Sequence, residues 1–269
     1  MRPVNKGDSP YETIADYHDA LPYLEGRIGL DCSYCGMKIV HMPEVEHVVS
    51  ESKGGDKTAW KNLLLACKYC NTRKASQTTP DNRKNYLWPD ENNTELAYSY
   101  IGGIPKVNSQ ILSALDASGE TAQKAENLYE LVKLGNVPES GDKDRRFRQR
   151  NKAFDDASHS LQNWKKLKET DGKAAMKDQI IRTAKNAGFF SVWMEVFKEE
   201  PEMKNALLEA FPGTETRFFD LDGNVKADSS CRRARSSNRG CYISKKERSL
   251  MERGRFSSIH KRPYFLLTV

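Results

Sequence analysis

The sequence predicts an α+β protein in which a small ββα unit precedes a mostly α-helical region. Two Cys-x-x-Cys pairs enclose two short apolar runs that have the character of strands, and the second pair is expected to open a helix. Beyond residue 110, apolar residues recur at the spacing of amphipathic helices. The chain has 269 residues, of which 38% are hydrophobic and 30% charged, so it can form one core or two modest domains.

These patterns divide the chain into five expected segments. They are an N-terminal helical segment (1–30), the ββα unit (31–78), a linker (79–110), a helical domain (111–225) and a basic, disordered tail (226–269). In the first segment, YETIADYHDAL predicts a helix over residues 11–21. No stretch resembles a secretory signal or a membrane span. We therefore expect a cytoplasmic protein whose thiols stay reduced.

Four cysteines in the ββα unit have the spacing of a closed tetrahedral zinc site. The expected ligands are Cys32, Cys35, Cys67 and Cys70. Disulfide bonds or unligated core cysteines are the alternatives, and a reducing compartment favours zinc. Because the two pairs are far apart in the sequence, the metal would close a loop large enough to hold a small functional unit.

The residues inside this loop alternate as in a strand. VEHVV, at residues 45–49, would send His47 to one face of the strand and Glu46 to the other. Gly54 and Gly55 mark a flexible point, and residues 63–66 then predict the returning strand. The second cysteine pair would open the helix that carries Asn71, Arg73 and Lys74.

These motifs resemble the HNH endonuclease family in its four-cysteine form: EH, then GGD followed by KNLLLAC, then CKYCNTRK. The resemblance covers about forty residues, the size of the smallest metal-stabilised units. It implies that His47 is the general base, that Glu46 and Asn71 bind a catalytic divalent metal, and that Asn62 ties the loop in place. Many family members have histidine at the position of Asn71, and aspartate or a second histidine at that of Glu46. These departures leave the preferred metal open.

Phosphodiester cleavage explains why these residue types occur together. It needs a nucleophile made from water, a metal that draws charge from the phosphate, and a base that titrates near neutrality. Glu46 and Asn71 are hard oxygen donors suited to Mg²⁺ or Mn²⁺, whereas four thiolates suit Zn²⁺. Lys74 or Arg73 could offset phosphate charge, the alternative being an exposed basic helix face. Glu44 is expected to be a loop or surface carboxylate.

The linker is expected to be a loop with one strand at residues 97–101. In the helical domain, apolar positions predict helices within residues 128–134, 147–167, 180–184, 189–197 and 203–211, with Pro201 in a first turn. These apolar stripes indicate a core. The aromatic segment FFSVWMEVF could instead dock a partner protein.

The basic character of the protein is confined to the tail. Residues 226–269 contain twelve Lys or Arg and three acidic residues, a balance of +9, so residues 1–225 carry 6 − 9 = −3. The tail could bind phosphates non-specifically or be a dispensable extension. A nuclease that searches DNA alone needs a broad basic face. The acidic body therefore indicates that a partner supplies much of the DNA contact.

The opening MRPVNKG, the segment YETIADYHDAL and the late FPG segment, together with the HNH motif, are similar to nuclease subunits of bacterial anti-phage defence systems of the Septu or retron-linked kind. This resemblance implies an ABC- or SMC-like ATPase partner and a DNA-cutting role. The alternative is a zinc-stabilised module that binds nucleic acid or protein without turnover. RNA is also open as a substrate, because a metal and a histidine can attack either backbone.

Overall fold

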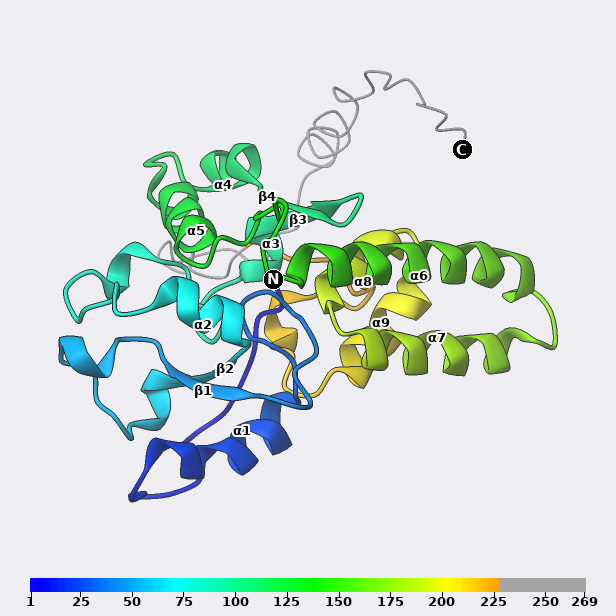
Figure 1. The fold of residues 1–269 in the computed structure, drawn as a ribbon. Helices are drawn as coiled ribbons and strands as arrows, with labels where there is room; N and C mark the ends of the chain where they lie inside the picture. Colours follow the sequence, from blue (N-terminus) through cyan, green and yellow to red (C-terminus); the bar gives the residue numbers. More distant parts are fainter. Residues whose placement is uncertain (228–269) are drawn as a thin grey trace, which may run out of the picture.

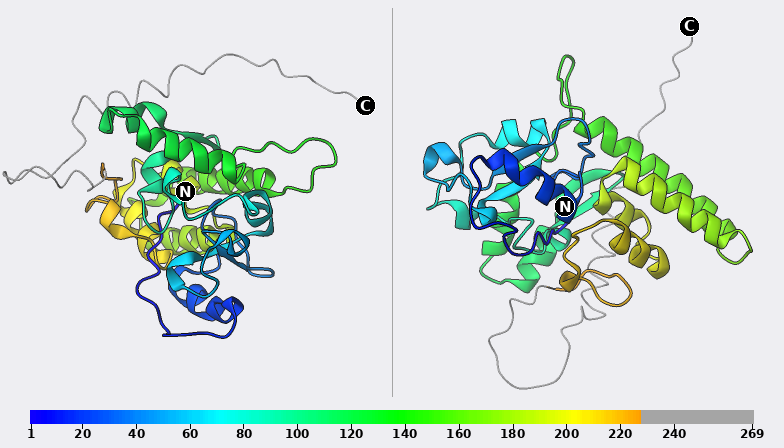
Figure 2. Two further views of the ribbon diagram at one scale, coloured as in Figure 1. Left: turned by 90° about the vertical axis from the view of Figure 1, so that its left-hand side faces the viewer. Right: turned by 90° about the horizontal axis from the view of Figure 1, so that it is seen from below.

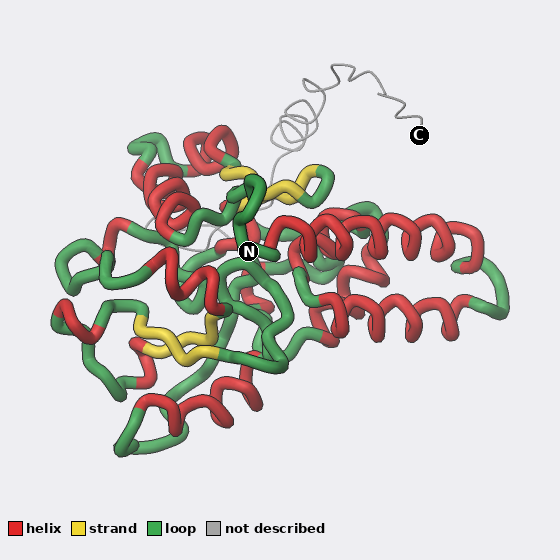
Figure 3. The backbone as a smooth tube through the Cα atoms, viewed as in Figure 1, coloured by secondary structure: helices red, strands yellow, loops and turns green. Residues whose placement is uncertain are grey.

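The computed structural model describes residues 1–227, in which nine α-helices accompany two small antiparallel sheets (Figure 1). The predicted α+β class is confirmed, because the first sheet lies near the N-terminus and helices dominate the later part (Figure 3). One cluster of buried apolar side chains runs from the N-terminal segment to Leu134 and also includes Ala153, Phe189 and Val192, and a second lies among the helices from residue 157 onward. Ala187 and Val225 pack against both clusters, so the two meet in one interior.

The first sheet and the helix that follows it form the expected ββα unit. Strand β1 (Glu44–His47) pairs antiparallel with β2 (Leu63–Ala66), and α2 (Lys68–Lys74) begins directly after Cys67. The returning strand and the helix lie where the sequence predicts them. The first strand is shorter than predicted and ends at His47. Because all four residues of β2 are buried, this strand anchors the unit in the core.

The predicted N-terminal helix begins later than residue 11. A 3₁₀ turn, η1 (Tyr17–Ala20), leads into α1 (Leu21–Ile28). Asp16 caps this turn and forms a capping box with Asp19, which fixes the start of the helical segment. Pro22 then falls in the first turn of α1, where its missing N–H costs no hydrogen bond.

The predicted linker contains regular structure. It holds η4 (Arg83–Asn85), α3 (Thr94–Ala97) and a hairpin of β3 (Tyr98–Ile101) and β4 (Ile104–Val107). β3 confirms the one predicted strand, while β4 was not predicted because Pro105 and Lys106 interrupt its apolar pattern. Gly102 and Gly103 both have positive φ and form the turn between the strands.

The later helices follow the predicted apolar stretches, except for α4, which no pattern predicted. Their bounds are α4 (Ser109–Leu115), α5 (Glu120–Leu131), α6 (Arg146–Leu167), α7 (Lys173–Ala187), α8 (Phe190–Val196), α9 (Pro201–Ala210) and the turn η5 (Thr216–Phe218). Helices α6 and α7 pack side by side and project from the body (Figures 1 and 2). Pro201 lies in the first turn of α9, as predicted.

Two predictions concern membranes and the tail. Among the described residues, no helix is long and apolar enough to cross a bilayer. The predicted basic tail, with Cys231 and Cys241, lies outside the described residues except for its first two positions.

Candidate metal centres and catalytic residues

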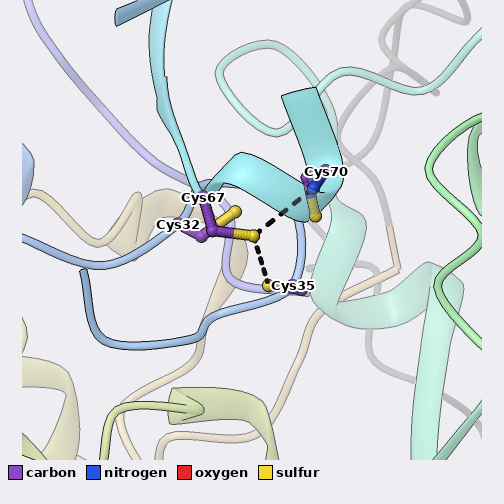
Figure 4. A group of neighbouring side chains, drawn as sticks. All are labelled: Cys32, Cys35, Cys67 and Cys70. Carbon is purple, nitrogen blue, oxygen red and sulfur yellow. Dashed lines mark hydrogen bonds between the residues drawn. The ribbon is translucent and has the colours of Figure 1, made fainter. Parts of the chain in front are cut away.

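The four predicted zinc ligands converge on one point (Figure 4). Their sulfur atoms all lie within 4.8 Å of one another, and all four side chains are buried and free of disulfide bonds. The first pair lies on the turn after α1, and the second pair opens α2, where the Cys67 sulfur accepts a hydrogen bond from the Cys70 amide.

The sulfur spacing suits zinc. The Sγ atoms of Cys35 and Cys67 are 3.7 Å apart. Sulfurs bound tetrahedrally at about 2.3 Å from zinc lie about 3.8 Å from one another, whereas a disulfide brings two sulfurs to about 2.05 Å. The arrangement can therefore hold a zinc ion, as the sequence predicts, and it differs from the disulfide alternative.

Asn62 ties the loop between the strands to the end of β1. Its side-chain nitrogen donates hydrogen bonds to the carbonyls of Val49 at 3.0 Å and Asp56 at 2.7 Å, and its oxygen accepts one from the Val49 amide at 2.8 Å. These three bonds use most of the capacity of the buried amide. The loop from Gly54 to Lys61 is therefore held in one conformation against the strand.

The same loop orients His47. The Nε2 atom of this half-buried histidine lies 2.8 Å from the carbonyl oxygen of Lys57, the residue after Asp56. A carbonyl only accepts hydrogen bonds, so Nε2 carries the proton in the neutral ring and Nδ1 is left as the basic nitrogen. The ring of Tyr17 lies against that of His47, with centroids 4.6 Å apart. No sequence pattern predicted this contact, because Tyr17 belongs to the N-terminal segment.

Glu46 and Lys74 form a buried ion pair between β1 and α2. The Lys74 Nζ atom lies 3.1 Å from Glu46 Oε2, and the two side chains are 2% and 0% exposed. The hydroxyl of Tyr34 donates to the other oxygen of Glu46, and Lys74 also donates to the His47 carbonyl and to Thr78. The expectation of an exposed basic face is wrong for Lys74, because its side chain is buried and its counter-charge lies inside the protein. The expectation that Lys74 offsets phosphate charge stays a prediction. Of the two basic residues Arg73 and Lys74, Arg73 is the exposed one.

Asn71, which the resemblance implies as a metal ligand together with Glu46, forms a hydrogen bond with Glu44. Its side-chain nitrogen donates to Glu44 Oε2 at 2.8 Å, and Lys68 Nζ lies 3.1 Å from Glu44 Oε1. Glu44 opens β1 and lies two residues before Glu46, so both carboxylates face α2. The prediction of a loop or surface carboxylate at Glu44 is wrong. The alternation of charged and apolar residues in EVEH could have predicted that Glu44 lies on the same face of the strand as Glu46.

The donors between β1 and α2 have the chemistry that a hard divalent cation requires. Glu46 Oε2 is a buried carboxylate oxygen whose one close partner is the Lys74 ammonium, and Asn71 of α2 and Glu44 of β1 add an amide and a carboxylate oxygen. Oxygen ligands of this kind suit Mg²⁺ or Mn²⁺. The residues fit such an ion chemically, although the ammonium of Lys74 already lies beside Glu46.

The comparisons with known proteins identify one part of the chain. No curated protein and no solved structure matches the sequence. The family model described as HNH endonuclease matches residues 32–77, from the first cysteine of the metal centre to just beyond α2. The chain therefore carries an HNH endonuclease domain, built around its four-cysteine centre.

Proposed function

We propose that this protein is a metal-dependent endonuclease that hydrolyses phosphodiester bonds in DNA. The observation that carries the proposal is the position of His47 within the HNH domain: its ring is held by a backbone carbonyl, and its second nitrogen is left basic. In this proposal the four cysteines hold a structural Zn²⁺, and Glu46 and Asn71 hold Mg²⁺ or Mn²⁺.

The chain's own residues have distinct roles in the proposed reaction. Nδ1 of His47 accepts a proton from the attacking water, and Asn62 keeps the loop that orients the ring. A bound divalent ion would polarise the phosphate and stabilise the departing oxygen. Glu44 orients the Asn71 amide, and Lys74 acts as a positioning residue by holding Glu46 and the His47 carbonyl.

The charge distribution supports a partner for DNA binding. Residues 1–225 carry a net charge of −3. Exposed basic residues around the site are Lys53, Lys57 and Lys61 on the loop between β1 and β2, and Lys68 and Arg73 on α2. Few phosphates can be neutralised by so small a basic group. We propose that an ABC- or SMC-like ATPase supplies further contact, and that the complex acts in the cytoplasm as the effector of an anti-phage defence system.

The second candidate function is a zinc-stabilised binding module without turnover. The observation that favours it is the burial of Glu46 against Lys74, which places a protein cation where the catalytic ion would compete. Cleavage of RNA by the same residues is a further form of the enzyme hypothesis.

Cleavage of plasmid DNA by the full-length chain tests the proposal. The assay uses zinc-loaded protein with Mg²⁺ or Mn²⁺, with and without an ATPase encoded beside it, and compares wild type with His47→Ala. The matched control is His159→Ala, an exposed histidine on α6. We expect His47→Ala to abolish cleavage and His159→Ala to retain it. No cleavage by any of the three proteins with the ATPase present would favour the binding module. Equal cleavage by all three would contradict the proposed role of His47 as the base. An RNA substrate tested in parallel distinguishes the two nucleic acids.

A further inference from the structure

Helix α6 carries two buried arginines, and the first of them contacts the four-cysteine centre. Arg146 and Arg150 lie one helical turn apart and are 1% and 0% exposed. The Nη1 atom of Arg146 lies 3.3 Å from the sulfur of Cys70, in hydrogen-bonding geometry. Arg148, on the intervening position of the helix, is exposed.

The two guanidinium groups have unequal partners within the protein. Arg146 binds Asp144 through two nitrogens and donates to the carbonyls of Val132 and Lys133. Arg150 donates through Nε to the Gly103 carbonyl at 2.8 Å, but its Nη1 atom has no hydrogen-bond partner. Among residues 1–227, no ion pair joins Arg150 to a carboxylate. A fully buried arginine without a counter-charge is costly, so an anionic group is expected nearby.

A loaded metal centre would supply that group. Four thiolates around one Zn²⁺ leave two net negative charges, and these lie in the interior beside α6. We propose that Arg146 and Arg150 are the charge partners of the zinc-bound thiolates, so that zinc loading holds α6 and the adjoining helices against the HNH domain. This inference depends on zinc occupying the cysteine site and concerns assembly, so it is independent of whether the protein cleaves DNA.

A second contact extends the effect beyond α6. The first cysteine pair turns at Gly36, whose carbonyl accepts a hydrogen bond from the Phe189 amide at 2.6 Å, at the junction of α7 and α8. Met37 also pairs with Gly188 as an isolated β-bridge. A Cβ atom on Gly36 would lie 3.2 Å from the Phe189 Cα atom, so the two segments are tightly packed. Loosening the cysteine turn would therefore disturb both α6 and the α7–α8 junction.

Hydrogen exchange of the full-length wild-type protein tests the coupling without any substitution. Zinc-loaded protein is compared with protein stripped by a chelator, and exchange is followed in peptides from residues 32–77, 146–152 and 186–194. Peptides from the distal part of α6 and α7 serve as the internal reference. We expect exchange to rise in all three regions when zinc is removed. A rise confined to residues 32–77 would overturn the proposal.

Zinc release from variants tests the two arginines directly. Release to a chromogenic chelator is measured for Arg146→Met, Arg150→Met and the control Arg148→Met. Substitution of groups around metal ligands typically weakens binding roughly 10- to 100-fold. We expect faster release of that order for the two buried positions, unchanged release for Arg148→Met, and partial recovery in Arg150→Lys, which keeps the charge. Release at the wild-type rate from folded Arg146→Met and Arg150→Met would refute the assignment.

Discussion

At the scale of single residues, the Glu46–Lys74 pair decides how the candidate catalytic site is held. Both side chains are almost fully inaccessible to water, and the pair links β1 to α2. A buried pair of this kind adds little net stability, because desolvation opposes the attraction. Removing one partner is different, since it leaves an uncompensated charge inside the protein. The pair therefore makes the position of Glu46 dependent on Lys74.

We expect Lys74→Met to lower the free energy of unfolding by about 3–5 kcal/mol, because Glu46 keeps its charge without a partner. The double variant Glu46→Gln/Lys74→Met should recover most of this loss. Denaturant unfolding at constant free zinc measures both. Lys68→Met is the control, since Lys68 is 72% exposed in its pair with Glu44 and should change stability by less than about 1 kcal/mol. A double variant as unstable as the sum of the single variants would show that the two charges do not interact.

Residue types at short spacing were enough to predict the four-cysteine cluster, whereas the resemblance to the HNH family predicted the restraint that Asn62 places on the loop. Each depends on local sequence: the cysteine pairs fix two turns, and Asn62 binds backbone within a single loop. The contacts of Lys74 and Asn71 were not predictable in the same way. They depend on which carboxylate of β1 lies opposite each turn of α2, and the pairing of the two elements in three dimensions decides this.

At the scale of elements, β2 and α2 were predictable because an apolar run and a cysteine pair fix their bounds. The N-terminal helix was not, since the capping box at Asp16 determines where it starts. That shift has a consequence for the site. It places Tyr17 in the turn η1 beside His47, with its ring 4.0 Å from that of His18 and 5.7 Å from the ammonium of Lys57.

Because Tyr17 packs on the ring of His47, its removal should disturb the proposed base while leaving the zinc centre intact. We expect Tyr17→Ala to lower kcat for DNA cleavage on the order of 10-fold with KM unchanged, since small displacements of catalytic groups are costly. Tyr17→Phe keeps the ring and should restore the rate. Single-turnover kinetics, together with zinc content, checks this. His18→Ala is the control, because His18 stacks on Tyr17; an equal loss in that variant would argue for a general effect of the turn.

At the scale of the whole molecule, the helical region is attached to the HNH domain at several separate places. Arg146 of α6 contacts Cys70, and the Phe189 amide donates to the carbonyl of Gly36 beside Cys35, while Arg2 of the N-terminal segment donates to the carbonyls of Ile28 and Pro212. Contacts between residues so distant in sequence produce no periodic pattern in the amino-acid sequence. The amphipathic stripes could therefore predict the helices, although not which of them would pack on the metal centre.

The distribution of charge over the whole chain leads to the last prediction. Since the body is acidic, phosphate contacts near the site should depend on individual lysines of the loop that holds His47. Lys57 is exposed, and its ammonium lies 3.8 Å from Glu51, a contact that water and salt weaken. We expect Lys57→Gln to reduce the slope of log K for DNA binding against log salt by about 0.9, the value for one phosphate contact. Fluorescence anisotropy over a salt series measures this slope, with Lys166→Gln near the far end of α6 as the control. An unchanged slope in Lys57→Gln would mean that Lys57 makes no phosphate contact, and the DNA would then have to be positioned by the tail or by the partner.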